Sequence, residues 1–224
     1  MTIAIETKDC TALSDAELAE MADICTDGPA GFDMGFISKQ RDEWVLVSQA
    51  RDGIKLVGFA FSTLERIGGT PSMLIGVASI KRNSKRDSVL KAVMAALYRR
   101  AVLAFPDEDV LVGTRLANPG AFGAFKGLED IVPRPGHKAS GEERAWGRRL
   151  AKRFGVEGRI DDRTFILGGD ESPAGLLDHT ALKPEAIATD VTAFFDPLDA
   201  SRRDTLVAFG WAMAEDLASG KLGR

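Results

Sequence analysis

Three runs of mainly apolar residues, separated by glycine-containing turns, are typical of successive β-strands in the first half of the chain. The runs are residues 44–50, 54–64 and 72–80. Asp52-Gly53 is a strong signal for a tight hairpin, and Gly68-Gly69 marks a second turn. The pattern predicts a three-stranded antiparallel meander, and Gly76 within the third strand predicts a bulge or a close approach of neighbouring groups.

A helical pattern follows the meander. Between residues 88 and 105, apolar side chains recur at helical spacing, which places them on one face of a helix. Asp87 is the expected N-cap, and Pro106 follows the expected end. Residues 109–116 read as the next strand. Because strand–helix–strand units cross over right-handedly, this strand is expected to run parallel to residues 72–80.

The remaining elements flank this unit. Ser14 and Glu17 form a capping box for a helix, and Asn118-Pro119 begins a short helix. Residues 31–41 fit either a short helix or an irregular loop, and the sequence leaves both open. Further elements are expected at Thr2–Thr7 (strand), 140–154 (helix), 163–167 (strand), 184–195 (helix) and 204–211 (strand, then a terminal helix).

Composition narrows the class of protein. The 224 residues are 45% hydrophobic and 28% charged, as in soluble globular domains, and the net charge of −4 argues against nucleic acid as a general partner. Cys10 and Cys25 lie in no redox or metal-binding motif, which fits a reducing compartment. The beginning of the sequence lacks the features of a secretory signal, and no apolar run approaches the ~20 residues of a membrane span. We therefore expect a cytoplasmic protein without a membrane partner.

Candidate metal ligands are scarce. His137 and His179 are the two histidines, and neither has a cysteine or carboxylate at metal-ligand spacing, so no metal site is expected. The charge is unevenly distributed instead. Residues 81–100 hold seven basic and one acidic side chain, whereas residues 161–200 hold two basic and nine acidic ones. This pattern suits a fold that gathers positive potential around one anionic ligand.

The strongest candidate for such a site is the basic turn, Lys81–Ser88, through which a strand enters a helix. Backbone amides at a helix N-terminus bind phosphate groups well. Together, the element order, this turn and a second motif, Asn118-Pro119-Gly120-Ala121, resemble the GCN5-related N-acetyltransferase (GNAT) superfamily over residues 1–135. The resemblance implies an α/β (α+β) fold with a mixed, mostly antiparallel central sheet flanked by helices. Residues 136–224 would be a C-terminal extension that completes the same domain.

In that family the turn reads Arg/Gln-x-x-Gly-x-Gly/Ala, and its amides hold the pyrophosphate of acyl-CoA. Arg82 matches this frame, but Lys85 and Asp87 replace the two small residues. Side chains at these positions crowd a phosphate, although nearby basic residues attract it. The resemblance implies that the thioester lies between the strands at 72–80 and 109–116. The implied cofactor-binding residues are Ile80, Arg82, Asn83, Ser84, Lys85, Arg86, Asp87, Ser88 and Asn118.

Catalytic residues are not assigned. The family's tyrosine, which protonates the leaving thiolate, falls on Phe125 here, and Tyr98 lies elsewhere in the sequence. The strand at 72–80 has no carboxylate, and Glu65 on the neighbouring strand is the nearest one. Alignment of an amine and a thioester can itself supply much of the rate, so these absences do not exclude acyl transfer.

The resemblance implies an acyl-CoA-dependent N-acyltransferase that moves an acetyl group from acetyl-CoA to an amine of a small molecule or peptide. Two alternatives remain open. One is a catalytically inactive GNAT-fold binding or interaction protein, favoured by the lost small residues and the missing tyrosine. The other is an acyltransferase that takes its acyl group from a carrier protein, whose acidic surface suits the basic residues 81–100. A homodimer is compatible with either.

Overall fold

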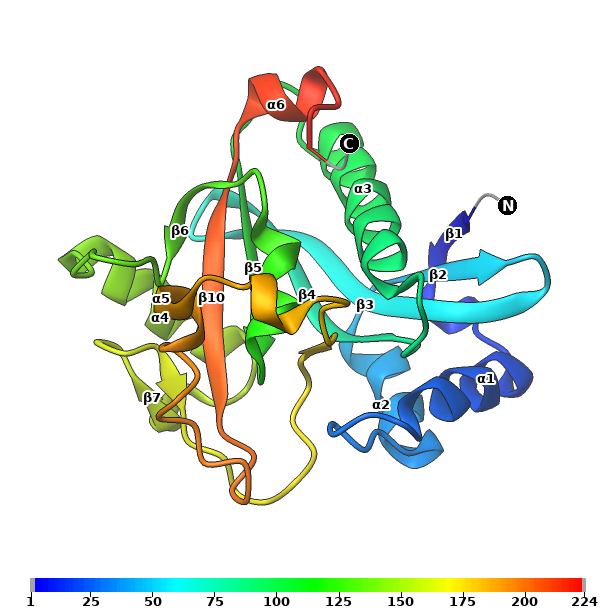
Figure 1. The fold of residues 1–224 in the computed structure, drawn as a ribbon. Helices are drawn as coiled ribbons and strands as arrows, with labels where there is room; N and C mark the ends of the chain where they lie inside the picture. Colours follow the sequence, from blue (N-terminus) through cyan, green and yellow to red (C-terminus); the bar gives the residue numbers. More distant parts are fainter. Residues whose placement is uncertain (1–2, 223–224) are drawn as a thin grey trace.

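One mixed β-sheet runs through the protein in the computed structural model, which describes residues 3–222 (Figure 1). The strands are β1 (Ala4–Asp9), β2 (Leu46–Asp52), β3 (Lys55–Ile67), β4 (Thr70–Ile80), β5 (Val110–Leu116), β6 (Glu129–Val132), β7 (Ile160–Asp161), β8 (Ile166–Leu167), β9 (Leu177–Asp178) and β10 (Thr205–Ala212). Their order across the sheet is β1-β2-β3-β4-β9-β5-β10-β8-β7, and β6 pairs with β10. Most neighbouring strands are antiparallel, as the sequence predicts.

Helices cover this sheet. The α-helices are α1 (Asp15–Cys25), α2 (Met34–Glu43), α3 (Arg86–Ala104), α4 (Gly141–Arg153), α5 (Thr189–Thr192) and α6 (Ala214–Ala218). The short 3-10 helices are η1 (Cys10–Ala12), η2 (Pro119–Phe125), η3 (Glu157–Arg159) and η4 (Pro184–Ala186). Helix α3 packs against β2 and β3, whereas α1 packs against β3 and β4 and lies beside α2 (Figure 1).

The central prediction, an antiparallel meander followed by a parallel crossover, is confirmed. Strands β2, β3 and β4 pair antiparallel, and β5 runs parallel to β4. Gly76 meets both expectations. It is skipped in the register between β3 and β4, and a Cβ atom there would lie 1.9 Å from the Trp44 indole. The capping box of Ser14 and Glu17 forms. Of the two alternatives left open for residues 31–41, the structure shows a helix, over residues 34–43.

Three local predictions are wrong. Only Ile166–Leu167 of the strand expected at 163–167 is extended, because Phe165 is left-handed (φ 62°) and the Asp161 carboxylate closes a turn by accepting from the Arg163 amide. The helix expected at 184–195 reduces to η4 and α5. There the Thr192 hydroxyl bonds the Thr189 carbonyl, and β-branched residues with Pro184 disfavour a longer helix.

The third wrong prediction concerns the start of α3. The helix begins at Arg86, so Asp87 lies within the first turn rather than at the N-cap, and Lys85 at the cap position makes no side-chain capping bond. Thr2, where the first strand was expected to begin, lies outside the described residues. The observed β1 begins at Ala4 and extends to Asp9, beyond the expected end at Thr7.

Strands from residues after 135 belong to the same sheet as the first five strands. β10 pairs with β5 along its length, and β8 continues the sheet beyond it. The most consequential addition is β9, a two-residue strand that lies between β4 and β5. In Figure 1 the chain near residue 175, drawn in yellow, rises from the lower edge of the molecule to the middle of the sheet.

Candidate functional site

Strands β4 and β5 diverge, and the gap between them is filled by the protein's own chain. They pair only over Ser72–Leu74 and Leu111–Gly113. Beyond this point β9 pairs in parallel with both strands, so that Leu177 faces Ala78 on one side and Leu116 on the other. We call the gap the donor cleft, because the resemblance to the GNAT superfamily implies that an acyl-CoA thioester would lie there. Residues 174–182, which fill it, are called the cleft segment.

A buried ion pair anchors the cleft segment to the basic turn. The Asp178 carboxylate accepts from an Arg82 guanidinium nitrogen at 2.8 Å, and the two side chains are 1% and 19% exposed. Gly28 covers this pair: a Cβ atom there would lie 2.5 Å from Asp178 Oδ2 and 2.7 Å from Arg82 Nη1. The arginine that matches the phosphate-binding motif therefore already holds an anion, which is a carboxylate of the same chain.

Arg86 and Asp87, at the end of the turn, also bind the cleft segment. Arg86 donates from Nε to the Thr180 carbonyl (2.6 Å) and from Nη2 to the Ala181 carbonyl (2.9 Å). The Asp87 carboxylate accepts from the Leu182 amide at 3.0 Å. Asp87 would crowd and repel a phosphate, yet here it serves as the acceptor for a backbone donor.

The Asp87 carboxylate also lies 3.1 Å from Nε2 of His179, whose side chain is 2% exposed. Burial lowers the pKa of His179, and the attraction of Asp87 does not outweigh it, so the imidazole is neutral at neutral pH. A carboxylate only accepts, so Nε2 carries the proton, and the buried Nδ1 has no partner within the described residues.

The other predicted site residues lie around these contacts. Ile80 is buried at the end of β4, and the exposed Ser84 and Ser88 contribute no contact to the cleft segment. The Lys85 ammonium donates to Asp52 at 2.5 Å, away from the cleft segment, and the side-chain oxygen Oδ1 of Asn83 accepts from the Lys85 amide. Asn118 caps η2 through the Ala121 amide at 3.3 Å. That these residues bind a cofactor stays a prediction.

Two further glycines allow the cleft segment to pass. At Gly120, in η2, a Cβ atom would lie 2.5 Å from the Ala181 amide nitrogen, so the cleft segment packs directly against the backbone of this helix. At Gly175, a Cβ atom would lie 2.8 Å from an Arg115 nitrogen and 3.1 Å from the Gly76 carbonyl oxygen. The close packing of the cleft segment therefore depends on glycines both within the segment, at Gly175, and in the helix against which it packs, at Gly120.

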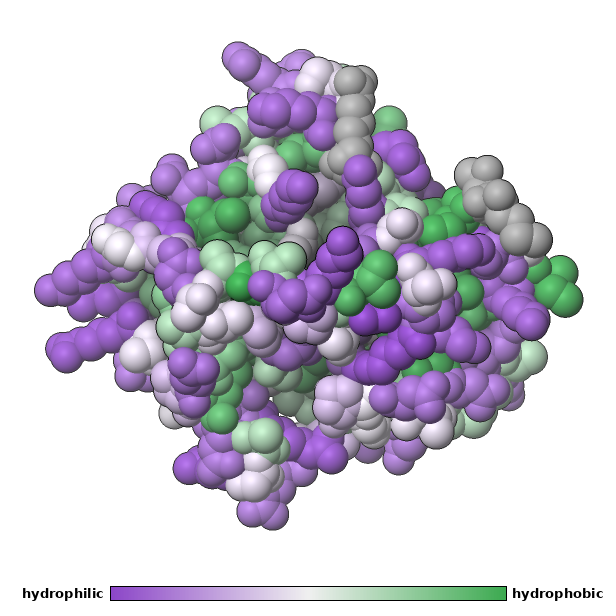
Figure 2. Space-filling model, in the orientation of Figure 1, coloured by the Kyte–Doolittle hydropathy of each residue, from purple (hydrophilic) through white to green (hydrophobic). Residues whose placement is uncertain are grey.

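The cleft segment separates two pockets. Its beginning, at Ala174 and Gly175, lines a pocket of about 480 Å³ that α2, β5, β10 and the loops around η3 enclose. Its end, at His179 and Ala181, lines a pocket of about 710 Å³ between α3 and η2. The second pocket is mainly apolar, and Figure 2 shows hydrophobic residues beside α3 on this face.

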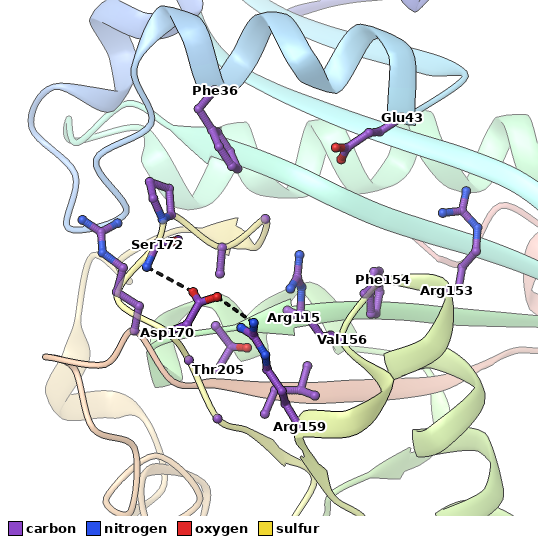
Figure 3. Close-up of a pocket in the computed structure, with 18 of the residues that line it drawn as sticks. Phe36, Glu43, Arg115, Arg153, Phe154, Val156, Arg159, Asp170, Ser172 and Thr205 are labelled. Atoms are coloured by element: carbon purple, nitrogen blue, oxygen red, sulfur yellow. Dashed lines mark hydrogen bonds and ion pairs between the residues drawn. The ribbon is translucent and has the colours of Figure 1, made fainter.

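The first pocket is charged, and we call it the Arg115 pocket. Figure 3 shows the Arg115 side chain directed into it, with Glu43 on α2 across the opening. The Arg115 guanidinium stacks on Phe154 with 5.1 Å between its carbon and the ring centroid. Burial lowers the pKa of Arg115 to about 10, opposed by the negative charge of Glu43, so the group remains protonated at neutral pH.

At the three positions that the sequence analysis considered for a general acid or base, Phe125, Tyr98 and Glu65, the structure shows no free acidic or basic group. Phe125 is buried, and the phenol of Tyr98 is also buried and donates to the Ala124 carbonyl. Glu65 forms an ion pair with Arg153 at 2.7 Å. Among residues 3–222, no three histidine, cysteine or acidic side chains are placed to hold a metal ion, and no helix is long and apolar enough to cross a membrane.

The sequence analysis did not identify Asp178 and Arg115, the two residues that matter most to the site. Asp178 is 96 positions from Arg82, and nothing local indicates that they meet. The charged residues at positions 85 and 87 were the available signal that the turn has partners within the chain, because charged side chains in place of small ones need groups to pair with. Arg115 lies in an apolar strand, where a lone arginine is an exception that invites an explanation.

Comparisons with solved structures find the same type of fold at low identity. The ribosomal-protein-S18-alanine N-acetyltransferase from Escherichia coli is 11% identical, covering 94% of this chain and 95% of that one, with a TM-score of 0.49. An IAA acetyltransferase from Bacillus cereus is 10% identical over 94% and 100%, with a TM-score of 0.47. An aminoglycoside 6'-N-acetyltransferase from Enterococcus faecium is 14% identical over 52% and 64%, with a TM-score of 0.41.

No protein-family model matches the chain, and no curated protein matches it. The similarities above are distant and concern the fold alone. The order of the elements, the parallel β4–β5 pair and the antiparallel strand beyond β5 confirm the GNAT-like mixed sheet predicted from the sequence. Because a fold does not determine a function, the activity of this chain has to be argued from its own site.

Proposed function

We propose that this protein is a small-molecule-binding protein with a GNAT-like fold. Its ligand occupies the Arg115 pocket, and its donor cleft is filled by the cleft segment of its own chain. One observation carries the proposal. The cleft segment fills the gap between β4 and β5. Its Asp178, Thr180 and Ala181 accept the hydrogen bonds that the arginines of the basic turn donate. Of the possibilities left open by the sequence, this favours the non-catalytic binding protein.

The energetics favour the closed cleft. Leu176 and Leu177 are 6% and 1% exposed, and burying each side chain contributes about 1.5–3 kcal/mol. A ligand that displaces both therefore loses about 3–6 kcal/mol, which at about 1.4 kcal/mol per tenfold weakens binding by roughly two to four powers of ten. An acyl-CoA that would otherwise bind at about 1 μM then binds only at about 0.1–10 mM.

Acyl-CoA-dependent N-acyltransfer to a small-molecule or peptide amine is the second candidate. The divergence of β4 and β5 and the basic turn at the start of α3 favour it. In this case, the cleft segment would have to leave, so that a donor entering beside α3 and an acceptor in the Arg115 pocket could meet. A carrier-protein donor needs the same space for its phosphopantetheine arm and depends on the same movement.

Thermal-shift titration separates the two candidates. Acetyl-CoA, CoA, a long-chain acyl-CoA and free phosphopantetheine are each added to the whole protein up to millimolar concentration. The binding protein proposed here shows no rise in melting temperature with any of them at micromolar concentration, whereas a donor that binds readily in the donor cleft raises it by linkage. A saturable rise at micromolar acetyl-CoA, together with release of CoA in the presence of amines, would overturn the proposal in favour of the acyltransferase.

A further inference from the structure

Arg115 is a nearly buried cation without a partner. The residue is 8% exposed, its Nε is buried and lacks a hydrogen-bond acceptor, and its guanidinium makes no hydrogen bond or ion pair with any residue in the described part of the chain. Removing a charge from water costs several kcal/mol unless a counter-charge compensates. A guanidinium held this way is a poor structural element and a good receptor for an anion.

Neighbouring arginines of the same pocket are arranged differently. Arg153 pairs with Glu65 at 2.7 Å, Arg159 pairs with Asp170 at 2.6 Å, and Arg203 donates to the Ala30 carbonyl at 3.0 Å. Each of these three guanidinium groups therefore already has an acceptor within the protein. Arg115 alone among the arginines that line the pocket within residues 3–222 keeps its planar set of donors available, and that set fits a carboxylate in two-point contact.

The surroundings fix the position of this guanidinium. It stacks on the ring of Phe154, and the missing side chain of Gly175 leaves room for one of its nitrogens. Stacking of this kind orients the donors without using them. Figure 3 shows the guanidinium directed toward the open part of the pocket rather than into the sheet.

A second unpaired charge lines the opposite wall. Glu43, at the last position of α2, makes no ion pair or side-chain hydrogen bond with the described residues, and its carboxylate faces the same space as Arg115 (Figure 3). The two charges attract each other electrostatically but form no direct ion pair. The apolar side chains of Phe36, Phe154 and Val156 line the same pocket.

We infer that the Arg115 pocket binds a small zwitterion of the amino-acid type, with its carboxylate on Arg115, its ammonium group toward Glu43 and its side chain against Phe36 and Val156. The inference rests on the proposed function, since it names the ligand class of the same pocket. A cavity of about 480 Å³ accommodates a molecule of this size with water around it. The opposed charges discriminate against molecules that carry only one of the two groups.

The test is calorimetric titration of the whole protein with the proteinogenic L-amino acids, followed by the N-acetyl and amide forms of the tightest binder. N-acetylation removes the ammonium group, and amidation removes the carboxylate. Each change is expected to weaken binding at least tenfold. The inference fails if no amino acid binds, or if either blocked form binds as well as the parent. Binding of the N-acetyl form alone would leave a carboxylate site, and thus the proposed function, in place.

Variants assign the binding to the two charges. Arg115→Met and Glu43→Gln are each expected to lose the amino-acid binding by at least tenfold. Arg149→Gln is the matched control, because Arg149 also stacks on an aromatic ring, that of Trp146 at 4.8 Å, but lies exposed outside the pocket. Arg115→Met should also melt at the same temperature as the unliganded protein or higher, whereas a purely structural arginine would make the variant less stable.

Discussion

The ion pair between Arg82 and Asp178 offers a quantitative test of whether the cleft segment occupies the donor cleft. Replacing Asp178 by alanine leaves the Arg82 guanidinium in a site that is mostly shielded from water. Removing one partner of a buried pair costs about 3–5 kcal/mol, because the remaining charge is uncompensated. For a chain of this length, each kcal/mol lowers the melting temperature by about 2–4 °C, so the expected fall is about 6–20 °C.

A matched control is available on the surface. Arg66 and Glu108 form an ion pair at 2.6 Å that is as close as the buried pair, but their side chains are 48% and 41% exposed. Glu108→Ala should therefore cost no more than about 1 kcal/mol. Urea denaturation of both variants, with the slope of the transition checked for two-state behaviour, gives the comparison.

The double variant Arg82→Met, Asp178→Leu sharpens the test. Replacing both members of a buried pair by apolar side chains of similar size is often neutral or stabilising by about 1–4 kcal/mol. The double variant should thus recover most of the stability that Asp178→Ala loses. If Asp178→Ala is no more destabilising than Glu108→Ala, Asp178 is solvated in solution, and the reasoning that places the segment in the cleft is refuted.

Three further predictions concern the fit and the titration of buried groups. Gly175→Ala should destabilise the protein by about 1–3 kcal/mol through crowding against Arg115 and the Gly76 carbonyl, whereas Gly158→Ala, with open space around it, should be near neutral in the same urea assay. Cys10 and Cys25 should not react with Ellman's reagent until the protein unfolds, because both are buried and burial raises the pKa of each thiol to about 12; rapid reaction of the native protein would argue against this packing. Burial opposes ionisation of Glu17, but hydrogen bonds led by Lys8 and Ser14 outweigh it and lower its pKa from 4.5 to about 2. The ionised Glu17 therefore contributes stability above pH 4.5 that is lost as the pH falls toward 2, and Glu17→Gln should flatten the melting temperature over that range.

Local signals predicted much of the fold. The capping box of Ser14, the Asp-Gly hairpin and the apolar face of α3 each act within a few residues, so their consequences can be read from the chain. The crossover to β5 follows from handedness, and the fold class follows from the order of these elements. The division of the chain at residue 135 stays a prediction.

The site could be predicted only in part, for a physical reason. The sequence identified the basic turn as a place that attracts an anion, and the structure shows an anion there, although it belongs to Asp178. Which anion binds at the turn depends on contacts between positions about 95 residues apart, such as the hydrogen bond from Arg86 to the carbonyl of Ala181. No periodicity or motif carries that information. The same holds for Arg115, whose lack of a partner is visible only once the surrounding strands are assembled.

Native-state hydrogen exchange at the Ala78 amide tests the occupation of the donor cleft most directly. This amide donates to the Leu176 carbonyl at 3.0 Å, so it is shielded only while the cleft segment is in place. With about 3–6 kcal/mol of leucine burial holding the segment, exchange should be slowed by at least roughly a hundredfold relative to an open amide. Acetyl-CoA at micromolar concentration should not change that rate. Exchange at the rate of an unprotected amide would contradict the central claim that the protein fills its own donor cleft.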